Sequence, residues 1–219
     1  IILISVISLF LIAQPDIGQT LLVVFCWAAL IFTSGINIYI LLAIFIAGAS
    51  LLTYLIIYVP KFDYIQGRIF SFFNRETGTH NFQSDKAIES ITSGGFFGKG
   101  IGEGVLKNRV PEAHTDYIIS VISEEFGVVA IMLILLLFLI LIYMVFKKIS
   151  FETNDKVKLI LIGSISLILM QATIHIGVNI RLFPTTGMTL PFLSYGGSSI
   201  ISTSILAGII LNLTKRKIN

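Results

Sequence analysis

Long uncharged apolar runs alternate with short polar segments along the chain. No Asp, Glu, Lys or Arg occurs in residues 17–60, 126–146 or 182–214. A run of about 18 or more such residues is typical of a membrane-spanning helix. The runs lack the alternation of apolar and polar positions that a membrane β-barrel requires. Because backbone groups in hydrocarbon must bond one another, the pattern predicts an all-α integral membrane protein, folded as a polytopic helical bundle.

The runs predict one membrane domain over residues 1–219. A short first run suggests a truncated span, so we expect this sequence to be the C-terminal part of a longer protein. Residues 60–115 form a long polar segment that we expect to contain short helices. Residues 181–198, rich in proline and glycine, predict a re-entrant or irregular segment. We place the spans at about 1–13, 17–33, 38–59, 116–146, 159–179 and 199–213.

Charge is scarce and unevenly placed. Charged residues make up 12% of the chain, and the mean hydropathy is +0.94. The net charge of +3 comes without a basic stripe, so nucleic-acid binding has no support. Lysines follow the fourth predicted span (147, 148, 156 and 158), and a Lys-Arg-Lys cluster lies at 215–217. The positive-inside rule therefore predicts a cytoplasmic C-terminus and places residues 60–115 and 181–198 on the outer face.

Asp116, at the outer end of the fourth predicted span, is the leading candidate for chemistry. At about 100° per residue it shares a helical stripe with Ser120, Ser123, Glu124 and Gly127. A carboxylate there can be a solvated cap for the helix N-terminus. It can also lie in a partly dry cleft, where it would act as a general base or bind a cation. The spacing alone leaves both interpretations open.

The glycines between Gly94 and Gly104 indicate either a flexible loop or a surface that lets backbone approach a bulky polar ligand. In the second case, nearby Lys99, Lys107 and Arg109 would meet phosphate.

Polar residues in and near the fifth predicted span also allow two interpretations. They form either interhelical hydrogen bonds or the lining of a cavity. Arg181, at the outer end of this span, is either an interface anchor or an anion contact. Asp16, between Pro15 and Gly18, is explained best as a helix-start carboxylate. The span's polar stripe consists of Ser164, Gln171, His175 and Asn179.

Three separated motifs occur in a fixed order along the chain: "QPDIGQT", "GGFFGKGIGEG" followed by "PEAHTDYIISVISEEFG", and "RLFPTTGMTLPFLSYGGSS". Together they resemble the SEDS family of multi-pass membrane glycosyltransferases, and within it the FtsW division branch. The resemblance implies ten spans, of which this chain would hold the last six. It also implies polymerisation of lipid II, an undecaprenyl-diphosphate-linked disaccharide peptide, into glycan strands during septal cell-wall synthesis. The site would be the outer face of the bacterial cytoplasmic (inner) membrane at the division septum.

The resemblance makes Asp116, in the "HTD" motif, the essential acid. One carboxylate can take the proton of the attacking sugar hydroxyl. The leaving diphosphate needs cationic groups or a divalent cation, Mg²⁺ or Mn²⁺, for which Asp116 is the candidate metal ligand. The candidate substrate-binding residues are Arg68, Gln83, Lys99, Lys107, Arg109, His114, Thr115, Arg181, Ser194 and Ser198.

The resemblance implies as partners a class B penicillin-binding transpeptidase, other divisome membrane proteins and the lipid bilayer. Earlier spans would contribute part of the substrate cavity, so this fragment could be inactive alone. Two other functions fit the same polar stripes and broken segments: a lipid-precursor flippase or other transporter, and a non-catalytic division scaffold. Polymer formation from lipid II by the purified protein would distinguish the enzyme from the transporter. For a scaffold, glycan synthesis should survive loss of the Asp116 carboxylate.

Overall fold

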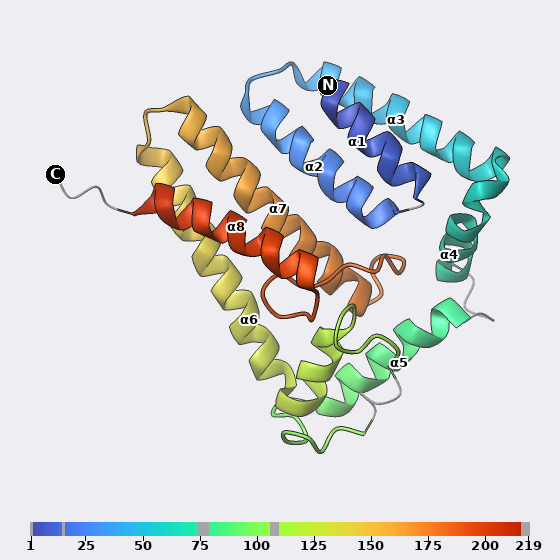
Figure 1. The fold of residues 1–219 in the computed structure, drawn as a ribbon. Coiled ribbons are helices and arrows are strands. Elements are labelled where there is room, and N and C mark those ends of the chain that lie inside the picture. The colour runs from blue at the N-terminus through green and yellow to red at the C-terminus, as the bar shows by residue number, and fades with distance from the viewer. Residues whose placement is uncertain (1, 15, 74–78, 106–109, 216–219) are drawn as a thin grey trace.

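The computed structural model describes residues 2–14, 16–73, 79–105 and 110–215, and its regular elements are all helical (Figure 1). No β-strand occurs in these four ranges. The membrane part consists of α1 (Ile2–Ala13), α2 (Ile17–Thr33), α3 (Ile38–Tyr58), α6 (Ile118–Phe151), α7 (Asp155–Asn179) and α8 (Gly197–Thr214). Between α3 and α6 lie a short 3-10 helix (Pro60–Phe62), α4 (Asp63–Phe73) and α5 (Thr79–Gly94).

Four of the helices in the described ranges are long and apolar enough to cross a membrane, namely α3, α6, α7 and α8. The apolar helices α1 and α2 are shorter. Many large apolar side chains on α3 and α6 are exposed, as expected for helices that face lipid. The predicted all-α integral membrane protein is therefore confirmed, with short helices in its long polar segment.

Helix α7 lies at the centre of the bundle and packs against α2, α6 and α8. At one end of α7, its residues Leu161, Ile165 and Ile168 form a core with Val145 of α6 and Ile210 of α8. At the other end, a second core joins α2, α5, α6 and α7 around the fully buried ring of Tyr117. This second core contains the residues on both sides of the "HTD" motif, Ala113 and Tyr117.

Helix α6 begins at Ile118, two residues later than expected, and it is interrupted at Gly127, whose φ of 74° is non-helical. A Cβ at Gly127 would lie 2.2 Å from the carbonyl oxygen of Phe96, and one at Gly94 would lie 1.9 Å from that of Ser123. These glycines let the backbones of α5, the following loop and α6 meet directly. Neither sequence interpretation of the glycines, a flexible loop or a ligand surface, included this packing role.

Candidate functional site

Asp116 lies in the turn just before α6 rather than on the helix. Its backbone N–H donates to the carbonyl oxygen of Glu112 at 3.1 Å. The N-cap of α6 is Tyr117, and no side chain forms a cap hydrogen bond there. Asp116 therefore neither caps the helix nor belongs to the predicted stripe. Ser120, Ser123 and Glu124 of that stripe are fully buried, whereas Asp116 is half-buried.

The backbone carbonyls of residues 114–116 all accept hydrogen bonds from the end of α7 or from the irregular segment after it. The carbonyl of residue 114 accepts from the N–H of Tyr195 at 2.9 Å. The next carbonyl accepts from Ser194 Oγ at 2.7 Å, and the carbonyl of Asp116 accepts from Asn179 Nδ2 at 2.9 Å. Both Ser194 and Asn179 are buried. Three consecutive hydrogen bonds therefore fix the "HTD" turn against the end of α7 and the irregular segment.

The polar stripe of α7 holds this irregular segment in place. Gln171 Nε2 donates to the carbonyl oxygen of Thr189 at 3.0 Å and to Ser199 Oγ at 3.1 Å. His175 Nδ1 is hydrogen-bonded to the carbonyl of Met188 at 2.7 Å. The stripe thus satisfies backbone groups that a non-helical segment leaves open at membrane depth. As a result, Gly187 is presented to the catalytic candidate: a Cβ there would lie 3.7 Å from Asp116 Oδ2.

The surroundings of Asp116 favour its neutral form. Burial raises the pKa of its carboxyl, and the nearby carboxylate of Glu112 raises that pKa further. The guanidinium of Arg68 opposes both and lowers the pKa. A carboxyl with a raised pKa binds a proton more readily, so it suits a group that must accept a proton from substrate. Sequence reasoning missed Glu112, although it stands four residues before Asp116 in the same motif.

Arg68 lies on α4, and its guanidinium is held near Asp116. One guanidinium nitrogen donates to the carbonyl oxygen of Thr185 at 2.9 Å. The guanidinium lies over the ring of Tyr64, 4.3 Å from its centroid, and also donates to the Tyr64 hydroxyl. The guanidinium of Arg68 is therefore held in a fixed position near Asp116.

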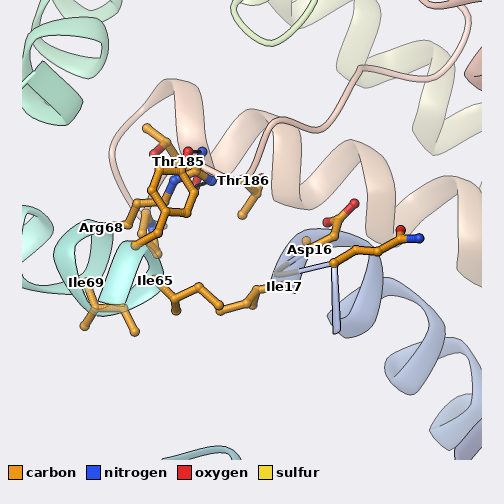
Figure 2. Close-up of a pocket in the computed structure, with 11 residues that line it drawn as sticks. Asp16, Ile17, Ile65, Arg68, Ile69, Thr185 and Thr186 are labelled. Carbon is orange, nitrogen blue, oxygen red and sulfur yellow. Dashed lines mark hydrogen bonds between the residues drawn. The ribbon is translucent and has the colours of Figure 1, made fainter. Parts of the chain in front are cut away.

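A pocket of about 250 Å³ opens beside Arg68 (Figure 2). Asp16 lies at its opposite side, where its carboxylate accepts from the N–H of Gln19 at 3.0 Å and caps α2. The predicted helix-start role of Asp16 is confirmed. Asp116 is not part of the lining, but Gly187 beside it directly follows a lining residue. The lining consists of Gln14, Asp16, Ile17, Gly18, Tyr64, Ile65, Arg68, Ile69, Pro184, Thr185 and Thr186.

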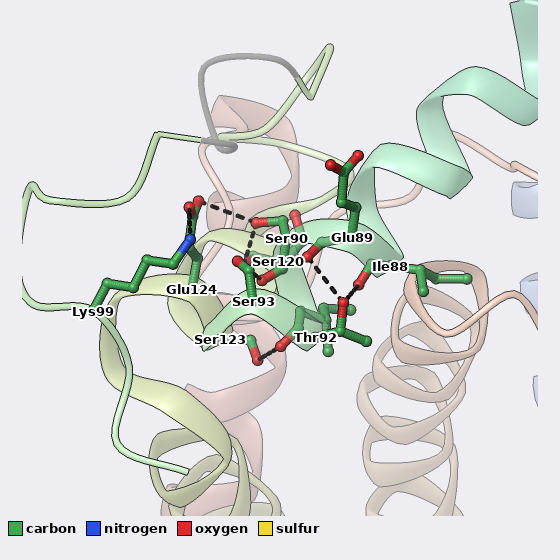
Figure 3. Close-up of polar contacts among 10 residues, drawn as sticks. Ile88, Glu89, Ser90, Thr92, Ser93, Lys99, Ser120, Ser123 and Glu124 are labelled. Carbon is green, nitrogen blue, oxygen red and sulfur yellow. Dashed lines mark hydrogen bonds and ion pairs between the residues drawn. The ribbon is translucent and has the colours of Figure 1, made fainter. Parts of the chain in front are cut away.

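Two predicted phosphate contacts are engaged within the protein. Arg181 forms an ion pair with Asp85 of α5, which ties the end of α7 to that helix. Lys99 Nζ lies 3.3 Å from Glu124 Oε1, and this carboxylate is fully buried and also accepts from Ser90 Oγ at 3.2 Å (Figure 3). Both cations hold parts of the polar segment on the bundle. Sequence reasoning did not predict either ion pair.

The remaining predicted contacts are dispersed. Gln83 is half-buried on α5, and Thr115 is half-buried beside Asp116. His114 and Ser198 are exposed. The hydroxyl of Ser194 is engaged within the protein, because it accepts from the N–H of Leu190 and donates to the backbone carbonyl of Thr115. Lys107 and Arg109 lie outside the described residues.

The fold and the site together define a multi-pass membrane protein with a part-buried carboxylate at one end of a helix bundle. The chain belongs to the FtsW, RodA and SpoVE family of cell cycle proteins, whose family model matches residues 1–219. The predicted family resemblance is thereby confirmed. Membership of this family and the apolar helices indicate a protein of the bacterial inner membrane.

Curated relatives resemble the chain over nearly its whole length. A probable peptidoglycan glycosyltransferase FtsW from Caulobacter vibrioides is 36% identical over 94% of this chain and 52% of the relative. One from Francisella salina is 37% identical over 96% of this chain and 53% of the relative. One from Enterococcus hirae is 32% identical over 100% and 58%. The chain thus spans about half the length of these relatives.

A solved structure resembles the fold as well. It was described under the words "Structural coordination of polymerization and crosslinking by a peptidoglycan synthase complex". The two chains superpose with a TM-score of 0.72 at 28% sequence identity. The match covers 97% of this chain and 60% of the other.

Proposed function

We propose that this chain carries the catalytic face of a peptidoglycan glycosyltransferase, which polymerises lipid II into glycan strands in septal cell-wall synthesis. The observation that carries the proposal is the placement of Asp116: a half-buried carboxyl with a raised pKa, fixed by its backbone and close to Arg68. The pocket beside Arg68 offers room for polar groups of a substrate. The names and structure of the relatives support the same activity.

In the proposed reaction, the sugar hydroxyl of one chain attacks the anomeric carbon of another sugar. A new glycosidic C–O bond forms while the bond from that carbon to the lipid diphosphate breaks. The hydroxyl proton passes to the carboxylate of Asp116, and general-base help of this kind typically contributes about 10²–10⁴ in rate. The diphosphate leaves with its negative charge. We assign the stabilisation of that charge to Arg68, whose guanidinium lies near Asp116.

We also propose that the site binds a divalent metal ion. Within the described ranges, no three His, Cys, Asp or Glu side chains gather as a metal-ligand group. Asp116 and Glu112 are neighbouring carboxylates, and Mg²⁺ typically takes one or two carboxylates together with substrate phosphates. The pair therefore fits a Mg²⁺ or Mn²⁺ ion shared with the diphosphate, where the ion would neutralise the leaving group.

For the protein in its complete form we further propose a cytoplasmic C-terminus, residence at the septum and a class B penicillin-binding transpeptidase as partner.

The test is polymer synthesis from purified lipid II by the complete protein in vesicles. Asp116→Asn and Asp116→Ala should abolish polymer while leaving the thermal unfolding midpoint near that of the parent. Asp155→Asn is the matched control, because Asp155 is an exposed carboxylate with 87% of its side-chain surface accessible, at the far end of α7. It should polymerise normally.

Normal polymer output from both Asp116 variants would refute the role of this carboxylate. If the parent protein moves lipid II between leaflets and makes no polymer, it is a transporter instead. If septal glycan synthesis in cells survives the loss of the Asp116 carboxylate, the scaffold interpretation is favoured.

A further inference from the structure

The glycine loop, residues 94–104 between α5 and α6, exposes large apolar side chains. Phe96, Phe97 and Ile101 have 74%, 84% and 79% of their surface accessible. Single exposed apolar residues are ordinary on proteins, but three within six positions form a patch that indicates a binding surface. Their exposure is not needed for the glycine contacts described above, which involve backbone atoms.

The loop is attached rigidly at the interruption of α6. The N–H of Val128 donates to the carbonyl of Gly95 at 3.0 Å, and the N–H of Val129 donates to that of Phe96 at 3.3 Å. These bonds satisfy the donors that the break at Gly127 frees. A side chain at Gly127 would collide with the loop. Phe96 is therefore held at the level of Gly127 along the helix.

That level coincides with one edge of the hydrocarbon layer. The uncharged stretch of α6 from Val128 to Phe146 is about 28 Å long at 1.5 Å per residue, and a bilayer core is about 30 Å thick. Lys147 and Lys148 follow at its other end. Gly127 thus marks the boundary of the span on the side away from those lysines.

The patch is also continuous with the lipid-facing side of α6. Just below the break, Val129, Met132 and Leu133 each have more than half of their surface exposed. Because the carbonyl of Phe96 accepts from the N–H of Val129, the loop backbone at Phe96 lies beside the start of this lipid-facing surface. The one lysine of the loop, Lys99, pairs with Glu124. The apolar side chains can therefore enter an interface without bringing an unpaired ammonium group with them.

From this geometry we infer that the glycine loop is a membrane anchor: Phe96, Phe97 and Ile101 insert into the lipid interface at the boundary marked by Gly127. Phenylalanine and other large apolar side chains of an interfacial segment enter the boundary between headgroups and acyl chains. The anchor fixes the depth of the α5–α6 connection relative to the lipid headgroups. This inference stands apart from the proposed glycosyl transfer, because it concerns lipid contact alone.

The test measures the depth of a tryptophan at position 97. Phe97→Trp is placed in the complete protein after its other tryptophans, Trp27 included, are replaced by phenylalanine. The protein is reconstituted in phosphatidylethanolamine–phosphatidylglycerol vesicles that carry lipids brominated near the headgroup or deep in the acyl chain. Leu136→Trp, on the lipid-facing side of α6, is the matched control for a deep position.

The expected result is quenching of the position-97 fluorescence mainly by shallow bromines, and of the Leu136→Trp control mainly by deep ones. Quenching by aqueous iodide without quenching by lipid would overturn the inference and place the loop in water. Protection from both quenchers would also overturn it, because a protein partner would then cover the patch. If the tryptophan-free background does not fold, a spin label on Phe97→Cys in a Cys26→Ala background reports the same depth through oxygen and nickel accessibility.

Discussion

Ser194 Oγ donates a hydrogen bond to the backbone carbonyl of Thr115 at 2.7 Å, across 79 positions of sequence. The same hydroxyl accepts from the N–H of Leu190 at 2.7 Å. One buried serine therefore joins the irregular segment after α7 to the residue that precedes the catalytic candidate. The position of Asp116 depends on this kind of contact, because the turn that carries it has no helix or strand of its own.

Removing the Ser194 hydroxyl should loosen this turn. Ser194→Ala leaves a buried N–H and a carbonyl without their partner, which we expect to lower the free energy of unfolding by about 1–3 kcal/mol. The rate of polymer synthesis should fall by more than the loss of folded protein explains, because Asp116 loses its fixed position. Ser204→Ala, at an exposed serine of α8, should change neither property. Equal thermal midpoints and equal rates for the two variants would contradict the anchoring role.

The pH dependence of activity should respond in opposite directions to the two charged neighbours of Asp116. Only the ionised carboxylate can accept a proton, so the rate falls as pH drops through the pKa of Asp116. Arg68 lowers that pKa and Glu112 raises it. Arg68→Gln should therefore move the acidic limb to higher pH, and Glu112→Gln should move it to lower pH.

This prediction is measured as the initial polymerisation rate across the acidic range, normalised to the plateau of each variant. Normalisation separates a shift in the limb from a loss of substrate affinity, which Arg68→Gln also causes if Arg68 contacts the diphosphate. Limbs that move in the same direction, or that do not move, would show that another group controls the profile.

Position 127, where α6 is interrupted, should tolerate no residue larger than glycine. Gly127→Ala must adopt a φ of 74° and places a methyl group 2.2 Å from the carbonyl oxygen of Phe96. We expect a loss of about 2–4 kcal/mol in unfolding free energy, measured by thermal unfolding in detergent. Gly208→Ala in α8 is the control, because no atom lies within 4 Å of its added Cβ. An unchanged midpoint for Gly127→Ala would mean that the close packing of loop and helix is not maintained.

The pair between Lys99 and Glu124 should show coupling in a double-mutant cycle. Lys99→Met leaves the buried carboxylate of Glu124 without this cation, which we expect to cost roughly 1–3 kcal/mol. The value is below that for a fully buried pair because 38% of the Lys99 side-chain surface is exposed. In the double variant Lys99→Met/Glu124→Gln the unpaired charge is gone, so part of the loss should return. Strict additivity of the two single changes would indicate that the pair contributes no coupling.

Sequence reasoning predicted part of the site because its residue types are distinctive. The "HTD" motif identified Asp116, and the polar stripe of α7 identified Gln171, His175 and Asn179 as residues facing the protein interior. Their long-range partners were not predictable, because these include the backbone carbonyls of Asp116, Met188 and Thr189, which lie in segments without regular structure. For the same reason, Ser194 was predicted as a substrate contact, whereas its hydroxyl bonds two backbone groups.

The amino-acid sequence by itself determined the all-α membrane class, because uncharged apolar runs can satisfy their backbone in hydrocarbon only as helices. Tertiary structure decided which charges meet. The sequence made Lys99 and Arg181 candidates for anion contacts, and made Arg68 a candidate substrate contact only through the family resemblance. In the structure Lys99 and Arg181 pair with Glu124 and Asp85. Arg68 lies near Asp116 instead. These outcomes depend on contacts across tens of residues, and a pattern of neighbouring positions does not encode the distances that set them.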